Sequence, residues 1–117
     1  MNSKVICFDI DGVICRTVGN NYRSSKPNKN VIKLVNKLFK KNKIILFTSR
    51  FMGRNRDKVA LAKKQGFEFT VNQLKRWKVN YHVLKFGKPS YDIIIDDKSF
   101  DFKKKWLKKF KSKLKIN

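Results

Sequence analysis

Acidic residues are scarce in this chain. Its 117 residues include 8 aspartates and glutamates against 30 lysines and arginines, which gives a formal net charge of +22. Cysteine occurs only twice, without the spacing of a metal site, which argues against a disulfide framework and favours reduced thiols. No apolar run approaches the length of a membrane span and no signal-peptide pattern opens the sequence, so we predict a cytoplasmic protein without a transmembrane segment.

Arginine is also scarce, because 24 of the 30 basic residues are lysine. A charge of +22 is typical of proteins that bind nucleic acid. Proteins that evolved to read phosphates or bases, however, lean toward arginine. Codons rich in A and T produce the same excess of Lys, Asn and Ile, so we favour compositional bias and keep nucleic-acid binding as the alternative.

Four of the eight acidic residues stand in two pairs, each directly after an apolar run. Asp9 and Asp11 follow the first such run, and Asp96 and Asp97 follow the last. Such runs are typical of buried strands in a parallel sheet, and open α/β sheets bind their ligands where the strands end. Paired like charges destabilise a fold unless something offsets the repulsion, and a divalent cation with oxygen ligands commonly does so. The pattern therefore predicts a metal-assisted phosphate site.

Strands and helices are expected to alternate along the chain. The predicted strands are residues 4–8, 43–48, 81–86 and 92–95, and the predicted helices are residues 30–41, 55–65, 70–77 and 99–114. Gly66 is expected to end the second helix in a left-handed conformation, and Thr70 to Gln73 resembles a capping box that opens the third. The alternation predicts a single α/β domain over residues 1–117, a Rossmann-like parallel sheet with helices on both faces.

The first acidic pair suits covalent phosphoryl transfer. Residues two apart in an extended segment point to the same side, so Asp9 and Asp11 are able to face one site. Gly12 permits a turn that aims backbone N–H groups at a phosphate. In such a site one carboxylate attacks phosphorus while the other protonates the leaving oxygen and then activates water. Thr48 offers a hydroxyl, and Lys88 a fixed positive charge, to the phosphate oxygens.

Four segments resemble, in order, the four motifs of the haloacid dehalogenase superfamily of phosphatases. They are Phe8-Asp9-Ile10-Asp11-Gly12, Phe47-Thr48-Ser49-Arg50, Gly87-Lys88-Pro89 and Ile95-Asp96-Asp97. The match spans residues 5 to about 101. Together with Tyr81-His82 and Asp92, it is also similar to the small phosphatases of bacterial capsule and surface-polysaccharide gene clusters.

The resemblance implies a role for each matched residue. Asp9 is the nucleophile that becomes an aspartyl-phosphate, and Asp11 is the general acid and base. Mg²⁺ is held by Asp9, by the backbone carbonyl of Asp11, and by Asp96 or Asp97, of which we slightly favour Asp97. Thr48 and Lys88 bind the phosphoryl oxygens. Beside the resemblance, Gly12, Ser49 and Arg50 are further candidates for binding the substrate or its phosphate. Asp101 is the candidate for the trailing carboxylate of the last motif.

Members of the superfamily usually carry a cap domain that selects the substrate, and this chain has no room for one. Residues 14–30 form at most a short flap. A capless site lies open to water, so we expect either this flap or a neighbouring subunit of a homo-oligomer to cover it.

Three features allow more than one interpretation. Arg50 either binds the substrate or caps the helix that follows. His82, the only histidine, is expected to be structural because it stands in an apolar strand. The aromatic residues four apart in the basic C-terminal helix, residues 99–114, are expected to pack on the sheet, and binding to a membrane surface is the alternative.

The sequence thus predicts a Mg²⁺-dependent phosphomonoesterase, a hydrolase that acts on a small phosphorylated metabolite such as a sugar phosphate. One alternative is a phosphatase that processes nucleic-acid ends and uses the basic surface to hold its substrate. The other is a binding module that keeps the fold without catalysis.

Overall fold

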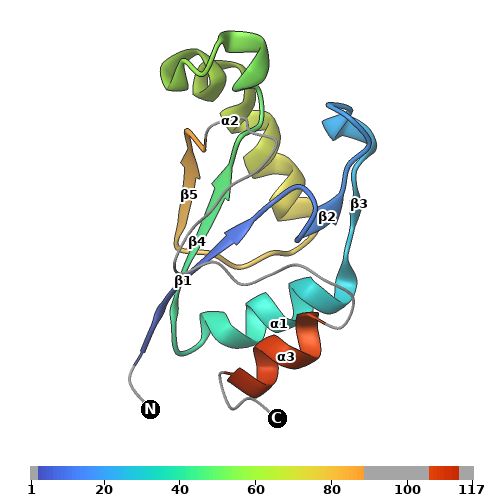
Figure 1. Cartoon of the computed structure of the whole chain (residues 1–117), viewed down its shortest axis with the longest axis vertical. Coiled ribbons are helices and arrows are strands. Elements are labelled where there is room, and N and C mark those ends of the chain that lie inside the picture. Colours follow the sequence, from blue (N-terminus) through green and yellow to red (C-terminus); the bar gives the residue numbers. More distant parts are fainter. Residues whose placement is uncertain (1–2, 89–105, 114–117) are drawn as a thin grey trace.

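The computed structural model describes residues 3–88 and 106–113. Its centre is a parallel sheet of three strands in the order β1-β4-β5, accompanied by three α-helices (Figure 1). The strands of this sheet are β1 Val5–Asp9, β4 Lys43–Thr48 and β5 Val83–Phe86. The helices are α1 Lys29–Phe39, α2 Val59–Arg76 and α3 Trp106–Lys113. The α/β class predicted from the sequence is confirmed.

Strand β4 lies between its two partners and carries the centre of the core. Its side chains alternate between one face that is fully buried at Ile44, Leu46 and Thr48 and another that is half-buried. The register pairs Asp9 with Phe47 and Thr48 with Phe86. Because the strands are parallel, their carboxyl ends meet at one edge of the sheet.

Helix α1 packs its apolar stripe into the core. The side chain of Asn28 caps its first turn by accepting a hydrogen bond from the N–H of Val31 at 3.2 Å. The buried residues recur at the three- and four-residue spacing of one helix face, and they are Val31, Ile32, Leu34, Val35 and Leu38. The helix predicted over residues 30–41 is therefore confirmed, with its ends shifted by one or two residues.

Helix α2 corrects the prediction of two helices separated at Gly66. It runs without interruption through Gly66, and Thr70 and Gln73 are buried in its interior instead of opening a new helix. The physical reason is close packing, because a Cβ on Gly66 would lie 2.3 Å from the Phe51 ring. The helix ends instead near Lys78, whose backbone is left-handed with φ 58°.

The predicted flap forms a small hairpin beside the sheet. Strand β2 Cys15–Arg16 pairs antiparallel with β3 Lys26–Pro27, and a 3₁₀ turn at Tyr22–Ser24 lies between them. A second 3₁₀ turn, Gly53–Asn55, follows β4.

The loop from β4 to α2 carries three residues other than glycine with positive φ, namely Phe51, Arg56 and Asp57. Left-handed conformations at such residues are unfavourable, and they persist where contacts with the surrounding structure compensate for the strain.

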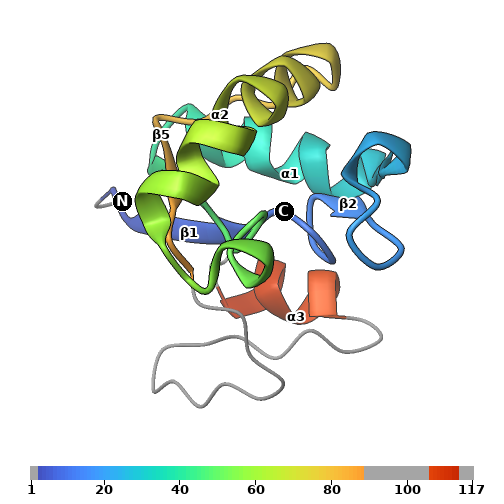
Figure 2. The same cartoon turned by 90° about the horizontal axis from the view of Figure 1, so that it is seen from above.

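Helix α3 lies on the opposite side of β1 from α1 and α2 (Figure 2). Its Phe110 packs edge-on against Phe8 of β1, with ring centroids 6.0 Å apart. The packing role expected for the C-terminal aromatic residues is thus confirmed at Phe110. The remainder of the predicted 99–114 helix, and the predicted strand at 92–95, lie outside the described residues.

His82 has the structural role expected for it. Its ring Nδ1 accepts a hydrogen bond from the backbone N–H of Ile44 at 3.0 Å. The backbone N–H of His82 donates to the carbonyl of Ile44 at 2.9 Å. Its ring stacks on Phe39 with centroids 4.3 Å apart. His82 thus extends the pairing of β4 to the segment that precedes β5. Strand β5 begins two residues later than the strand predicted over residues 81–86.

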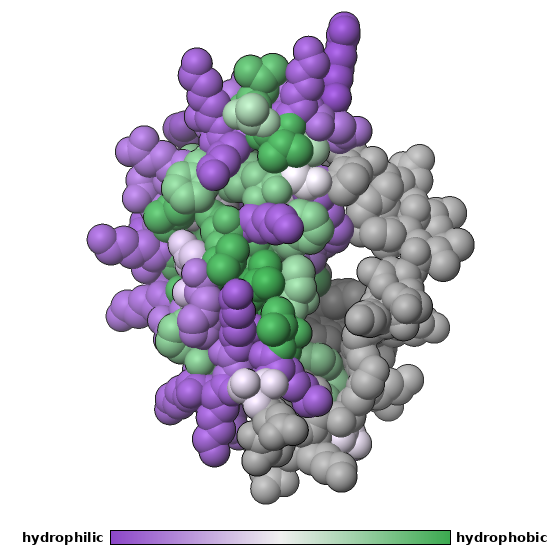
Figure 3. All heavy atoms as spheres, turned by 90° about the vertical axis from the view of Figure 1, so that its left-hand side faces the viewer, coloured by the Kyte–Doolittle hydropathy of each residue, from purple (hydrophilic) through white to green (hydrophobic). Residues whose placement is uncertain are grey.

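The surface on the β5 side mixes apolar and charged side chains (Figure 3). The exposed large apolar residues of the described chain include Val5, Val59, Leu61, Phe67 and Val83. Across residues 3–88 and 106–113, no helix has the length and apolarity needed to cross a membrane.

We expect Gly66→Ala to lower the free energy of unfolding by about 1–3 kcal/mol, because the added methyl group overpacks the contact with Phe51. Alanine in an open helix interior would instead stabilise by about 0.5–1 kcal/mol relative to glycine. Urea unfolding measures the difference, with the exposed Lys64→Ala in the same helix as the control. A Gly66→Ala protein as stable as the wild type would contradict this account of the continuous helix.

Candidate active site

The carboxyl edge of the sheet brings together residues from three predicted motifs. Asp9 ends β1, Thr48 ends β4, and Lys88 follows β5 by two residues. The N–H of Lys88 donates to the carbonyl of Thr48 at 3.2 Å, which holds the two segments side by side. The Nζ of Lys88 lies 2.6 Å from Oδ2 of Asp9, and the two side chains are 14% and 33% exposed. This edge therefore groups a partly exposed carboxylate and ammonium group with the hydroxyl of the buried Thr48.

A tight turn follows β1 and orients Asp11. The carbonyl of Ile10 accepts hydrogen bonds from the N–H groups of Val13, Ile14 and Cys15 at 2.9–3.2 Å. Gly12 has φ 92°, and its own N–H donates to the carbonyl of Cys15 at 2.8 Å. Nothing lies within 4 Å of a Cβ added to Gly12, so the left-handed backbone, and not lack of space, requires glycine there. The N–H of Gly12 itself serves the turn, and the prediction that the turn aims backbone N–H groups at a phosphate stays a prediction.

Asp11 binds Arg50 through both carboxylate oxygens. The Nε of Arg50 donates to Oδ2 and its Nη2 donates to Oδ1, each at 2.9 Å. The Arg50 side chain is fully buried, and that of Asp11 is 27% exposed. Such a fork-to-fork pair fixes the plane of the carboxylate as well as its position. The repulsion expected between Asp9 and Asp11 is thus offset by two side-chain cations, Lys88 and Arg50.

Arg50 is in turn held by the β4 end, by α2 and by the flap. Its backbone N–H donates to Oγ1 of Thr48 at 3.0 Å, and its Nη1 donates to Oε1 of Gln73 at 2.6 Å. Its guanidinium carbon lies 4.8 Å from the centroid of the Tyr22 ring. The amide of Gln73 donates to the Tyr22 carbonyl at 2.7 Å. Gln73 therefore joins the flap to the arginine that binds Asp11.

The flap contacts Asp11 through one hydroxyl and one thiol, and a second hydroxyl lies behind the first. The Oγ1 of Thr17 donates to Oδ1 of Asp11 at 2.5 Å and lies 2.6 Å from Oγ of Ser25. The Sγ of Cys15 donates to the same Oδ1 at 3.5 Å. Burial raises the pKa of the Cys15 thiol, which favours the protonated donor form. The flap is thus part of the surroundings of Asp11.

Sequence reasoning missed five residues around Asp11: Cys15, Thr17, Tyr22, Ser25 and Gln73. The sequence indicates Cys15 only as one of two reduced thiols, and Gln73 only as part of a capping box. None stands within three residues of Asp11 in the sequence, and no spacing rule links them to it. Their contacts arise from the hairpin and from the uninterrupted helix α2.

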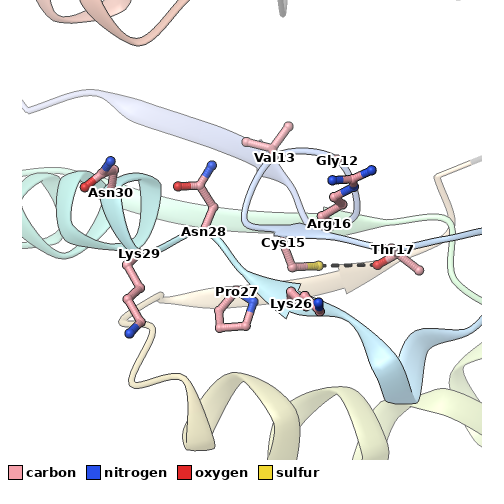
Figure 4. Close-up of a pocket in the computed structure, with 10 residues that line it drawn as sticks. All are labelled: Gly12, Val13, Cys15, Arg16, Thr17, Lys26, Pro27, Asn28, Lys29 and Asn30. Atoms are coloured by element: carbon pink, nitrogen blue, oxygen red, sulfur yellow. Dashed lines mark hydrogen bonds between the residues drawn. The ribbon is translucent and has the colours of Figure 1, made fainter.

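A groove opens beside this turn, between the flap and the start of α1 (Figure 4). Gly12 lies at its edge, and the basic side chains of Arg16, Lys26 and Lys29 line it. All three are exposed. The groove therefore places positive charge next to the residue that follows Asp11.

The donor set around Asp9 fits a hard divalent cation in chemistry. Asp9 supplies a carboxylate that is one-third exposed, and the backbone carbonyl of Asp11 is the second oxygen ligand predicted from the sequence. Within residues 3–88 and 106–113, no three His, Cys, Asp or Glu side chains come together as a metal site. The other predicted ligands, Asp96 and Asp97, and the predicted Asp101 lie outside this part of the chain. Ser49 is half-buried, and its carbonyl accepts the N–H of Met52 at 3.0 Å.

Comparisons with known proteins agree with the fold class. No protein-family model matches the chain, and no curated protein matches it. A solved structure of a structural-genomics target from Vibrio cholerae is similar, with 24% sequence identity and a TM-score of 0.75. The match covers 82% of this chain and 81% of that one. At this identity the likeness shows a shared α/β fold and carries no activity across.

We expect Asp11→Asn and Arg50→Met to be coupled in stability. Each single change leaves a polar or charged partner unpaired in a mostly buried pair, whereas the double change removes both. The double variant should be less destabilised than the sum of the single variants by about 1–3 kcal/mol, measured by urea unfolding. Arg54→Met is the matched control, because the exposed Arg54 stacks on the Phe51 ring at 4.7 Å. Its effect should add to that of Asp11→Asn, and additivity at Arg50 would contradict the pair.

Proposed function

We propose that this protein is a capless phosphatase of the haloacid dehalogenase type, which hydrolyses small phosphate monoesters through an aspartyl-phosphate. One observation carries the proposal: Asp9 ends a strand of a parallel sheet with the Lys88 ammonium 2.6 Å from its carboxylate and Thr48 at the end of the adjacent strand. A carboxylate, a hydroxyl and a cation grouped at the carboxyl edge of a parallel sheet suit a phosphoryl group. Three of the four motifs quoted from the sequence supply them.

In the first half-reaction, Asp9 attacks phosphorus with a carboxylate oxygen, and the bond from phosphorus to the leaving oxygen breaks. Asp11 gives a proton to that oxygen. In the second half-reaction, Asp11 takes a proton from water, whose oxygen attacks phosphorus and releases the Asp9 carboxylate. Asp11 thus ends each cycle protonated as it began.

Lys88 and Thr48 are the proposed phosphate-binding side chains, with Ser49 beside them. The Thr48 Oγ1 accepts the N–H of Arg50, so its own proton is left to donate to a phosphoryl oxygen. Lys88 approaches Asp9 closely enough to contact a phosphoryl group bound to it. Gly12 contributes through the turn that orients Asp11.

Mg²⁺ is the proposed cofactor, held by the Asp9 carboxylate and the Asp11 carbonyl, with Asp96 or Asp97 completing the set. When bound, the ion supplies charge neutralisation at the phosphoryl oxygens. A hard cation suits these oxygen donors better than a soft metal does.

The proposed substrate is a small phosphorylated metabolite such as a sugar phosphate or a capsule precursor. The flap already contacts Asp11 through Thr17, which favours the flap over a second subunit as the cover of the site. A homo-oligomer stays a prediction. Cys7 and Cys15 are both free thiols, in keeping with the cytoplasmic location proposed for the reaction.

We expect the wild-type protein to hydrolyse p-nitrophenyl phosphate with Mg²⁺ and to lose this activity in excess chelator. Asp9→Asn should reduce turnover to background, because it removes the attacking charge, and the protein should still unfold cooperatively. Release of p-nitrophenol, followed in both buffers, is the measurement.

The matched control is Asp57→Asn. Asp57 is exposed and has φ 60°, a conformation that asparagine adopts as readily. This variant should keep wild-type turnover. More than trace activity in Asp9→Asn would exclude the covalent mechanism, and full activity in chelator would exclude the metal site.

We expect a higher kcat/KM for some small sugar or polyol phosphate than for any 3′- or 5′-phosphorylated oligonucleotide at physiological salt. A small ester meets only the local charges, so its KM should change little with salt. An oligonucleotide held by lysines releases counterions, and its apparent affinity would fall by orders of magnitude for roughly six or more phosphate contacts. Steady-state kinetics across a salt series compares the two, and the reverse ranking would establish the nucleic-acid alternative.

A further inference from the structure

The sequence predicts that Arg50 either binds the substrate or caps the helix that follows, but its contacts in the structure indicate a third role. The guanidinium is fully buried, and four of its five N–H groups have acceptors within the protein. The four acceptor atoms are Asp11 Oδ1, Asp11 Oδ2, Gln73 Oε1 and Cys15 Sγ. A guanidinium whose N–H donors are already taken by protein acceptors is poorly placed to bind a phosphate as well.

The two oxygens of Asp11 are bound unequally. Oδ1 accepts from Arg50 Nη2, from the Thr17 hydroxyl and from the Cys15 thiol, whereas Oδ2 accepts from Arg50 Nε among the described residues. The single proton of the thiol is shared with the Ile10 carbonyl at 3.6 Å, but the two other donors already occupy the lone pairs of Oδ1, which leaves it little capacity for a further proton. Oδ2 is therefore the oxygen with room to carry a proton to or from a substrate.

We propose that Arg50 is a positioning residue that holds the Asp11 carboxylate with Oδ2 directed to the leaving-group oxygen. Gln73 and the Tyr22 ring hold Arg50 in turn. The inference rests on the proposed phosphatase function and adds to it the orienting group of the general acid. The step it serves is one proton transfer: Oδ2–H breaks and a bond from that proton to the leaving oxygen forms as the phosphorus–oxygen bond breaks.

The positioning role predicts that loss of Arg50 affects two kinds of substrate to different extents. The p-nitrophenolate group departs without protonation, whereas the alkoxide of an alkyl phosphate such as glycerol 2-phosphate requires a proton. A residue that positions the acid matters for the alkyl ester and much less for the aryl ester. A residue that binds the phosphate matters equally for both, and its loss appears in KM.

The experiment compares Arg50→Met, Arg50→Lys and Gln73→Met with wild type on both esters in Mg²⁺. We expect Arg50→Met to lower kcat for glycerol 2-phosphate at least about tenfold more than for p-nitrophenyl phosphate, within the range of general-acid catalysis. KM should change little. Lysine keeps the positive charge but loses the two parallel N–H donors, so kcat of Arg50→Lys for glycerol 2-phosphate should lie between those of the wild type and of Arg50→Met. Gln73→Met leaves the ion pair between Asp11 and Arg50 in place, so it should show a smaller difference between the two esters in the same direction. It replaces Arg50→Met in the test if Arg50→Met does not fold.

Arg54→Met is the matched control, because Arg54 makes a comparable cation–π contact with Phe51 and is exposed. It should leave the ratio of the two activities unchanged. Equal losses of kcat on both esters, or a rise in KM shared by both, would overturn the positioning role and leave the phosphatase intact. A wild-type protein that hydrolyses neither ester would overturn the proposed function, and the role of Arg50 with it.

Discussion

The buried ion pair between Asp11 and Arg50 is the interaction on which the rest of the site depends. It joins the turn after β1 to the turn after β4, so the two neighbouring strand ends are tied by side chains as well as by their ladder. A buried guanidinium is costly unless its donors find acceptors. Gln73 from α2 and the Tyr22 ring from the flap complete its surroundings. Three other segments of the chain thus converge on the Arg50 side chain.

The two carboxylates of the first motif are treated differently by the fold. Asp9 is one-third exposed at the end of β1, with a lysine ammonium beside one oxygen. The other oxygen of Asp9 accepts the N–H of Ile10 at 3.1 Å, whereas Asp11 is held through both oxygens by the fully buried Arg50. In the proposed reaction this difference matches their roles, because a nucleophile must reach phosphorus whereas a proton carrier must keep a fixed direction.

The loop that presents Arg50 is strained, and tertiary packing supports it. Phe51 has φ 65°, and its ring fills the space left by Gly66 of α2. The centroids of the Phe51 and Tyr22 rings lie 5.0 Å apart. Arg54 covers the Phe51 ring. Phe51, the residue after Arg50, is thus packed against both α2 and the flap.

The sequence by itself predicted the three described strands of the parallel sheet, with Asp9 and Thr48 at strand ends and Lys88 in the turn that follows the third strand. These follow from local apolar runs and from the rule that parallel strands end together, neither of which needs long-range detail. The tertiary structure alone decided that α2 continues through Gly66 and that Arg50 binds Asp11. Glycine ends helices often enough to mislead, and only the Phe51 ring packed against it shows why this one does not. The partner of Arg50 lies 39 residues away, and a side chain with five donors has no preferred partner until the fold brings one within reach.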